Sequence, residues 1–148
     1  MNESELEWIL THTFKKNMIE YIEANPAVFE ELIQLIFATR KPYSWRAAWL
    51  LWSCMDENDP RVKKYISRMI TSLPLLPDNM KKDICLVLLK MEIDEDNEGI
   101  LFDQCVSIWE DQSKKPAVRH NSLKIMLKIA GKYPELLSEI TSLTKDIY

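Results

Sequence analysis

One stretch of sequence decides the fold: SWRAAWLLWSCMDENDPRVKKYI, residues 44–66. It holds an apolar segment with three tryptophans, then a polar turn, then a second segment opened by a proline. Trp45, Trp49 and Trp52 are four and three residues apart, which places them on one face of an α-helix. We interpret this face as packed core, because a helix that is apolar around most of its circumference is buried by neighbours on several sides. A stacking platform for a ligand is the alternative.

Prolines divide the rest of the chain into further helical segments. They stand at positions 26, 42, 60, 74, 77, 116 and 134, and apolar residues recur every three or four positions after several of them. This pattern predicts seven or eight helices. Pro42, Pro77 and Pro116 are 35 and 39 residues apart, and a period of roughly 37 residues is the size of a two-helix repeat. We therefore expect an all-α superhelix of about four stacked antiparallel helix pairs; an irregular helical bundle is the alternative.

Polar residues at the starts of these segments predict helix caps. Ser4 and Glu7 have the spacing of a capping box, and a break near Thr11–Thr13 divides the first segment. Single caps are expected at Ser44, Asp59, Asp78 and either Asp96 or Asn97.

Composition and charge narrow the class of protein. The chain has 148 residues, of which 47% are hydrophobic and 28% charged, so we expect a single helical-repeat domain over residues 1–148. Gly99 and Gly131 stand alone, which argues against a glycine-rich nucleotide loop. A net charge of −4 argues against a general affinity for nucleic acid. The sequence has neither a signal peptide nor a long uncharged run, so we expect a cytoplasmic protein that does not enter the membrane.

Neither a metal nor a cofactor is expected. Cys54, Cys85 and Cys105 are too far apart for a metal-binding or redox motif and are predicted to be reduced, buried thiols. The acidic run that begins at Asp94 has carboxylates at calcium-loop positions, but Cys105 stands where the bidentate glutamate is required. The two histidines have no partner at ligand spacing. We expect a protein that is not an enzyme.

The segment at 44–66 resembles an armadillo or HEAT-type repeat, with RAAW in its first helix and DPRV opening the second. ANPAVFEELIQLIF (24–37) and KIAGKYPELLSEI (128–140) extend the similarity to small bacterial proteins of this superhelical type. The resemblance implies the fold. The families that share these motifs include scaffolds, transport receptors, enzyme regulators and a group of DNA glycosylases.

We expect a non-enzymatic scaffold or adaptor whose partner is another protein, because such repeats present extended binding surfaces. The candidate contacts are cations on predicted helix faces: Arg46, Arg61, Lys64, Arg68, Lys124 and Lys128. A nucleic-acid-binding or DNA-repair module is the alternative, since HEAT-like DNA glycosylases place tryptophans and a catalytic carboxylate in a basic groove. Asp56 follows Trp52 by one helical turn. A regulatory subunit that assembles with itself is a third interpretation.

Overall fold

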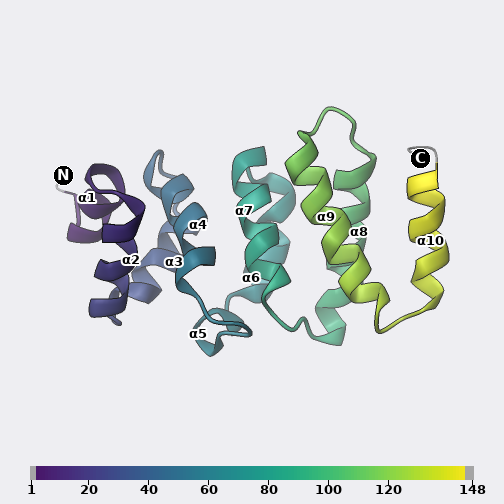
Figure 1. Cartoon of the computed structure of the whole chain (residues 1–148), viewed down its shortest axis with the longest axis horizontal. Coiled ribbons are helices and arrows are strands. Elements are labelled where there is room, and N and C mark those ends of the chain that lie inside the picture. The colour runs from purple at the N-terminus through teal and green to yellow at the C-terminus, as the bar shows by residue number, and fades with distance from the viewer. Residues whose placement is uncertain (1–2, 146–148) are drawn as a thin grey trace. The chain divides into compact units, whose positions relative to one another are not determined.

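The computed structural model describes residues 3–145 and consists of α-helices joined by short loops (Figure 1). No β-strand occurs among these residues, so the all-α prediction is confirmed. The chain forms two compact units, Met1–Lys64 (unit 1) and Tyr65–Tyr148 (unit 2). That residues 1–148 behave as one domain stays a prediction.

Unit 1 is organised around its fourth helix. Its helices are α1 (Glu5–His12), α2 (Lys15–Ala24), α3 (Val28–Phe37), α4 (Tyr43–Cys54) and the short α5 (Pro60–Lys63). Helix α4 packs against α1, α2 and α3. Apolar side chains from all four fill the core, among them Leu10, Met18, Leu32, Ile36, Leu50 and Leu51. The burial of these side chains is the main force that holds the unit together.

Unit 2 is organised around α9. Its elements are α6 (Ile66–Ser72), the 3-10 turn η1 (Leu73–Leu75), α7 (Asp78–Leu89), α8 (Glu95–Glu110), α9 (Pro116–Ala130) and α10 (Glu135–Thr144). Helix α9 packs against α7, α8 and α10 (Figure 1). Its buried residues include Val118, Ile125, Met126 and Ile129. Helix α10 buries only Ile140 within its span, and the indole N–H of Trp109 donates to the Leu143 carbonyl at 3.1 Å.

The described residues contain more helices than the seven or eight predicted, because two segments are each divided. The break expected near Thr11–Thr13 is confirmed, since α1 ends at His12 and α2 begins at Lys15. The Thr13 hydroxyl donates to the Ile9 carbonyl at 2.8 Å and so competes with the next backbone hydrogen bond. The segment after Pro60 is divided into α5 and α6.

Two of the predicted caps are confirmed. In the capping box of α1, the Ser4 hydroxyl accepts from the Glu7 N–H at 3.1 Å, and Glu7 Oε1 accepts from the Ser4 N–H at 2.9 Å. Asp59 caps α5, with Oδ1 accepting from the Arg61 N–H at 3.0 Å. Both side chains satisfy backbone donors that lack a partner within the helix.

The cap expected at Ser44 is wrong. Helix α4 begins one residue earlier, at Tyr43, and Ser44 lies buried inside it. Its hydroxyl donates to the Leu35 carbonyl at 2.6 Å and accepts from the Arg40 N–H at 2.8 Å. Ser44 therefore joins the end of α3 to the start of α4. This role depends on a tertiary contact, so the local sequence does not indicate it.

The expected caps of α7 and α8 are also wrong. Asp78 is the first residue of α7 after Pro77, and it makes no capping hydrogen bond. Helix α8 is capped by Asp94, whose Oδ1 accepts from the Asn97 N–H at 3.1 Å, and not by Asp96 or Asn97. Acidic residues lie on both sides of the start of this helix, and only the backbone conformation determines which of them is extended at the cap.

The buried cysteines give a direct test of packing in unit 2. Burial raises the pKa of Cys85 to about 12 and raises the pKa of Cys105 even further above its ordinary value. Cys54 in unit 1 is only half-buried. We expect one thiol to react with Ellman's reagent in the native protein and three in denaturant. Cys54→Ser should abolish the native reaction, and rapid labelling of Cys85 or Cys105 would contradict the packing.

Candidate functional site

The tryptophans of α4 lie at the edge of its buried face. That face consists of Ser44, Ala47, Ala48, Leu50 and Leu51. Trp45 and Trp49 are half-buried, and Trp52 is 37% exposed. The prediction that the three indoles are packed core is therefore wrong. Alanine methyl groups let the backbone of α4 approach its neighbours closely, and an indole at the same position would not fit that space.

Lysine ammonium groups lie over two of the indoles. Lys15 Nζ, at the start of α2, is 4.8 Å from the ring centroid of Trp49. Lys41 Nζ, in the loop between α3 and α4, is 4.5 Å from that of Trp45. Such contacts contribute about 0.5–1 kcal/mol each at exposed sites. We call these four side chains the aromatic–cation face of unit 1.

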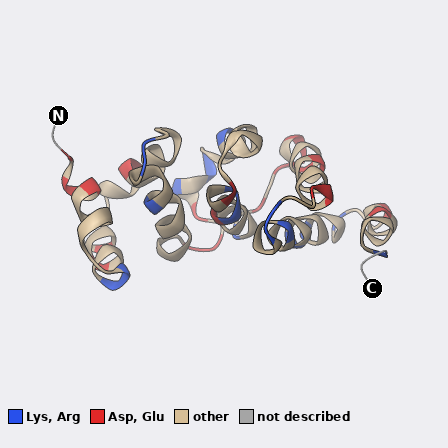
Figure 2. Ribbon diagram, turned by 90° about the horizontal axis from the view of Figure 1, so that it is seen from above, with Lys and Arg blue, Asp and Glu red and all other residues tan. Residues whose placement is uncertain are grey.

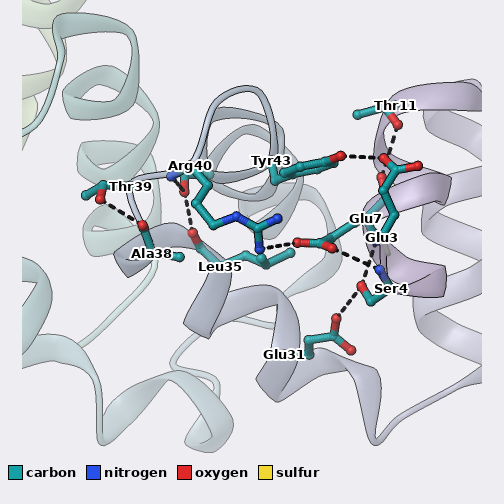
Figure 3. A network of polar contacts seen from close by, with 11 residues as sticks. Glu3, Ser4, Glu7, Thr11, Glu31, Leu35, Ala38, Thr39, Arg40 and Tyr43 are labelled. Carbon is teal, nitrogen blue, oxygen red and sulfur yellow. Dashed lines mark hydrogen bonds and ion pairs between the residues drawn. The ribbon is translucent and has the colours of Figure 1, made fainter. Parts of the chain in front are cut away.

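A buried carboxylate fixes the loop that leads into α4 (Figure 3). Glu7 of α1 is only 4% exposed, and its Oε2 pairs with Arg40 Nη1 at 2.6 Å. The other carboxylate oxygen of Glu7 belongs to the capping box of α1. Because Arg40 also donates its N–H to Ser44, a single glutamate links the first helix to the start of α4.

Further polar contacts extend this network to α3. The Ser4 hydroxyl donates to Glu31 Oε2 at 2.8 Å, and the Tyr43 hydroxyl donates to Glu3 (Figure 3). The bond to Glu3 raises the pKa of Tyr43. These contacts hold α1, α3 and α4 in register, and thereby set the position from which Trp45 and Trp49 project.

Two of the predicted contact residues, Arg61 and Lys64, line one pocket of about 320 Å³ in unit 1. Arg61 binds Asp59 through two hydrogen bonds, Nε to Oδ1 at 3.0 Å and Nη2 to Oδ2 at 2.8 Å. Its guanidinium also lies 3.6 Å from the ring centroid of Phe29. Lys64 pairs with Glu30 at 2.9 Å. Both cations are thus engaged within the unit, and Arg61 holds the pKa of Asp59 at about 2.

The remaining predicted residues are distributed over other helices. Arg46 is exposed on α4, Arg68 is exposed on α6, and Lys124 is exposed on α9. Lys128 Nζ donates to the carbonyl oxygens of Leu89, the last residue of α7, at 2.7 Å and of Met91, just beyond it, at 2.8 Å. Its charge therefore stabilises a helix C-terminus.

Helices α8 and α9, which pack against each other, differ in the charge of their exposed side chains. Figure 2 shows acidic residues at the start of α8 and basic residues along α9. Beyond the end of α9, Lys132 Nζ pairs with Glu98 Oε2 at 3.0 Å, and the Tyr133 hydroxyl donates to Glu98 Oε1 at 2.8 Å. Glu98 of α8 thus holds the segment that follows α9 through both of its carboxylate oxygens.

The two histidines and Asp56 lie on three different elements. His12 stacks on Trp8, with ring centroids 4.6 Å apart, and His120 is exposed on α9. Asp56 is exposed in the turn after α4, where its N–H donates to Asp59 Oδ2 at 3.0 Å. Across residues 3–145, no group of three or more histidine, cysteine or carboxylate side chains is arranged to hold a metal ion.

Comparison with known proteins identifies the architecture. The model of the HEAT repeat domain matches residues 3–147, nearly the whole chain. The chain belongs to the HEAT repeat family. The resemblance expected from residues 44–66 is confirmed. No curated protein and no solved structure gives a significant match.

HEAT repeats stack helix pairs side by side and generally serve as scaffolds for protein interactions. In this HEAT repeat protein, none of the helices in the described part of the chain has the length and apolarity needed to cross a bilayer. The aromatic–cation face therefore belongs to a fold whose members generally use helix surfaces for binding.

Sequence reasoning found the tryptophans but not their environment. Lys15 and Lys41 were not among the predicted contacts, because each reaches an indole on a different element. The apolar spacing of α4 fits two adjacent stripes, one of small residues and one of indoles, and periodicity alone does not say which stripe faces the core.

Removing the carboxylate of Glu7 should destabilise the loop that leads into α4. We expect Glu7→Ala to lower the free energy of unfolding by about 1–2 kcal/mol, because the variant loses the capping box and leaves Arg40 without its partner. Urea denaturation measures this change. Glu5→Ala, at an exposed position in the same helical turn, is the matched control and should change stability by less than about 0.5 kcal/mol. Equal losses in both variants would contradict the role of the network.

The pair of Asp59 and Arg61 predicts a pH dependence of stability. The folded-state pKa of Asp59 is about 2, below its ordinary 3.8. The contribution of its charge to the free energy of unfolding is therefore complete above pH 4 and disappears as the pH falls through 2. We expect Asp59→Asn, which keeps a capping oxygen, to lower the free energy of unfolding by about 1–2 kcal/mol at pH 7 after allowance for the exposure of Arg61.

Denaturant titrations at several pH values test the contribution of the Asp59 charge to stability. The difference between wild type and Asp59→Asn should narrow between pH 4 and pH 2. The control is Asp56→Asn, which alters an exposed carboxylate in the same turn. A difference that is independent of pH would show that the Asp59 charge does not contribute.

Proposed function

We propose that this protein is a non-enzymatic adaptor that binds another protein through the aromatic–cation face of unit 1. The observation that carries the proposal is the partial exposure of Trp45 and Trp49 on a helix whose buried face is already filled by smaller residues. Tryptophan is enriched at the energetically dominant positions of protein interfaces. We expect such an adaptor to act in the cytoplasm.

Charge around the face indicates the chemistry of the partner. Lys15 and Lys41 lie over the indoles, and Arg46 is exposed on the same helix as both tryptophans. Phe14, which precedes Lys15, is 83% exposed and adds apolar surface. A partner segment that combines carboxylates with apolar side chains complements this surface, because the cations would pair with the acids while the rings bury apolar area.

Binding of nucleic acid is the second candidate, and the same face favours it. Indoles beside ammonium groups can stack bases and neutralise phosphates, as single-strand-binding proteins do. The net charge of −4 and the internal pairing of Arg61 and Lys64 reduce the positive surface that a DNA-repair module would use. We therefore rank a protein partner first.

Truncation of both indoles should abolish partner binding while the fold is retained. We expect Trp45→Ala/Trp49→Ala to weaken a partner's affinity by about 30-fold or more, equivalent to at least 2 kcal/mol from two central aromatic contacts. The partner is obtained by co-purification from the native cell, and its affinity for purified protein is measured by calorimetry. Circular dichroism confirms that the variant is helical.

The matched control is Leu127→Ala, which truncates an apolar side chain with 47% exposure on α9. It should bind the partner like the wild type. The double variant Lys15→Glu/Lys41→Glu should bind an acidic partner with lower affinity. Polarisation titrations with single- and double-stranded DNA form the other arm. DNA binding that survives physiological salt and requires both indoles would establish the second candidate instead, and partner binding that is unchanged in the double variant would refute the first.

A further inference from the structure

A pocket of about 240 Å³ in unit 2 combines an apolar wall with two lysines. Leu73, Pro74 and Ile108 form the apolar side. The polar side consists of Lys81 on α7, Gln104 and Ser107 on α8, and Asp111 and Lys114 in the loop after α8. The pocket has room for roughly eight water-sized groups, which is the size of a small organic acid.

One of the two lysines is already neutralised. Lys114 Nζ lies 3.0 Å from Asp78 Oδ1 and 3.9 Å from Asp111 Oδ2. The pairing with Asp78 raises the pKa of Lys114. Asp111 is in turn held by Ser113, whose N–H and hydroxyl both donate to its Oδ1. Asp78, Asp111 and Lys114 thus form a closed group with little capacity for another charge.

The other lysine has no carboxylate within ion-pair distance. Lys81 is only 7% exposed, and no carboxylate oxygen of residues 3–145 lies within 4.0 Å of its Nζ. Burial and the neighbouring charge of Lys114 lower its pKa, and Asp78 and Asp111 offset this only in part. Its Nζ is not among the buried side-chain nitrogens and oxygens of the described residues that lack a hydrogen-bond partner, so the ammonium opens on the pocket that Lys81 lines. An anion bound in the pocket would be the counter-ion that Lys81 lacks.

An unsatisfied acceptor lines the same pocket. Oε1 of Gln104 is buried and is the one buried side-chain oxygen or nitrogen in the described chain without a hydrogen-bond partner. Leaving such a group unpaired is energetically unfavourable. The terminal torsion of glutamine is soft, so a donor within the pocket can capture this oxygen with a small rotation.

We propose that this pocket binds a carboxylate that carries an O–H or N–H donor beside it and a short branched apolar chain. The carboxylate pairs with Lys81, the donor bonds Oε1 of Gln104, and the apolar chain lies against Leu73, Pro74 and Ile108. A phosphate fits less well, because Asp78 and Asp111 repel a dianion more strongly than a singly charged group.

This chemistry has two sources: a free 2-hydroxy or N-acylated amino acid, and the C-terminal residue of a polypeptide, where the last N–H is the donor. The site lies within unit 2 and does not depend on the aromatic–cation face of unit 1, so the two proposals can fail separately. The probes are 2-hydroxy-4-methylpentanoate for the free acid and an acetylated peptide ending in Gly-Leu for the chain terminus.

Calorimetry and amide NMR titrations of the full chain test the proposal. We expect one or both probes to bind with Kd on the order of 1 mM or tighter, with shifts confined to the residues around the pocket. The peptide ending in a C-terminal amide should not bind. Binding of the hydroxy acid alone would assign the site to a free metabolite, and stronger binding of the peptide would assign it to a chain terminus. Absence of binding by both probes would overturn the proposal.

Two variants separate the contributions of the pocket residues. Lys81→Met keeps the length of the side chain and removes its charge, and it should weaken binding at least tenfold; Lys82→Met, the neighbour on α7 that does not line the pocket, should bind like the wild type. Gln104→Leu should remove the preference for 2-hydroxy-4-methylpentanoate over 4-methylpentanoate, with no loss of stability. If folded Lys81→Met binds like the wild type, or if Gln104→Leu keeps the preference, the assignment is wrong.

Discussion

The close approach of α4 to its neighbours is the constraint on which unit 1 depends. Ala47 and Ala48 are fully buried, and together with Leu50 and Leu51 they allow α4 to pack against three other helices. A face made of small residues leaves no space for indoles, so Trp45 and Trp49 are displaced to the rim of the interface. The same packing that makes the core compact therefore also creates the surface to which we assign binding.

Polar contacts give this arrangement its specificity. Helix burial is non-directional, and the apolar side chains of unit 1 alone would permit several orientations of α1 relative to α4. Glu7 selects one of them, because it must satisfy both the N-terminus of its own helix and the guanidinium of Arg40. Asp59 acts similarly at α5, where it caps the helix and holds Arg61 over Phe29. Both oxygens of each of these buried carboxylates have a hydrogen-bond or ion-pair partner.

Unit 2 uses charge differently. Lys128 and Lys132 are engaged by carbonyl oxygens and by Glu98, and Lys114 by Asp78. Lys81 differs from these cations, because it makes no ion pair and lines the pocket of unit 2. Structural lysines are generally paired or solvated. The contrast is the reason for assigning a ligand to the pocket of unit 2 and none to the paired cations elsewhere.

The sequence by itself determined the helical class, the repeat family, most of the breaks between helices and the caps at Ser4 and Asp59. These features follow from local rules of periodicity, proline placement and side-chain bonds to nearby backbone. Only the tertiary structure decided which apolar stripe of α4 is buried, that Ser44 joins two helices, and which lysines reach an indole, a carbonyl or no counter-ion. Those outcomes depend on residues distant in sequence, and on whether the space between packed helices accepts an alanine or a tryptophan.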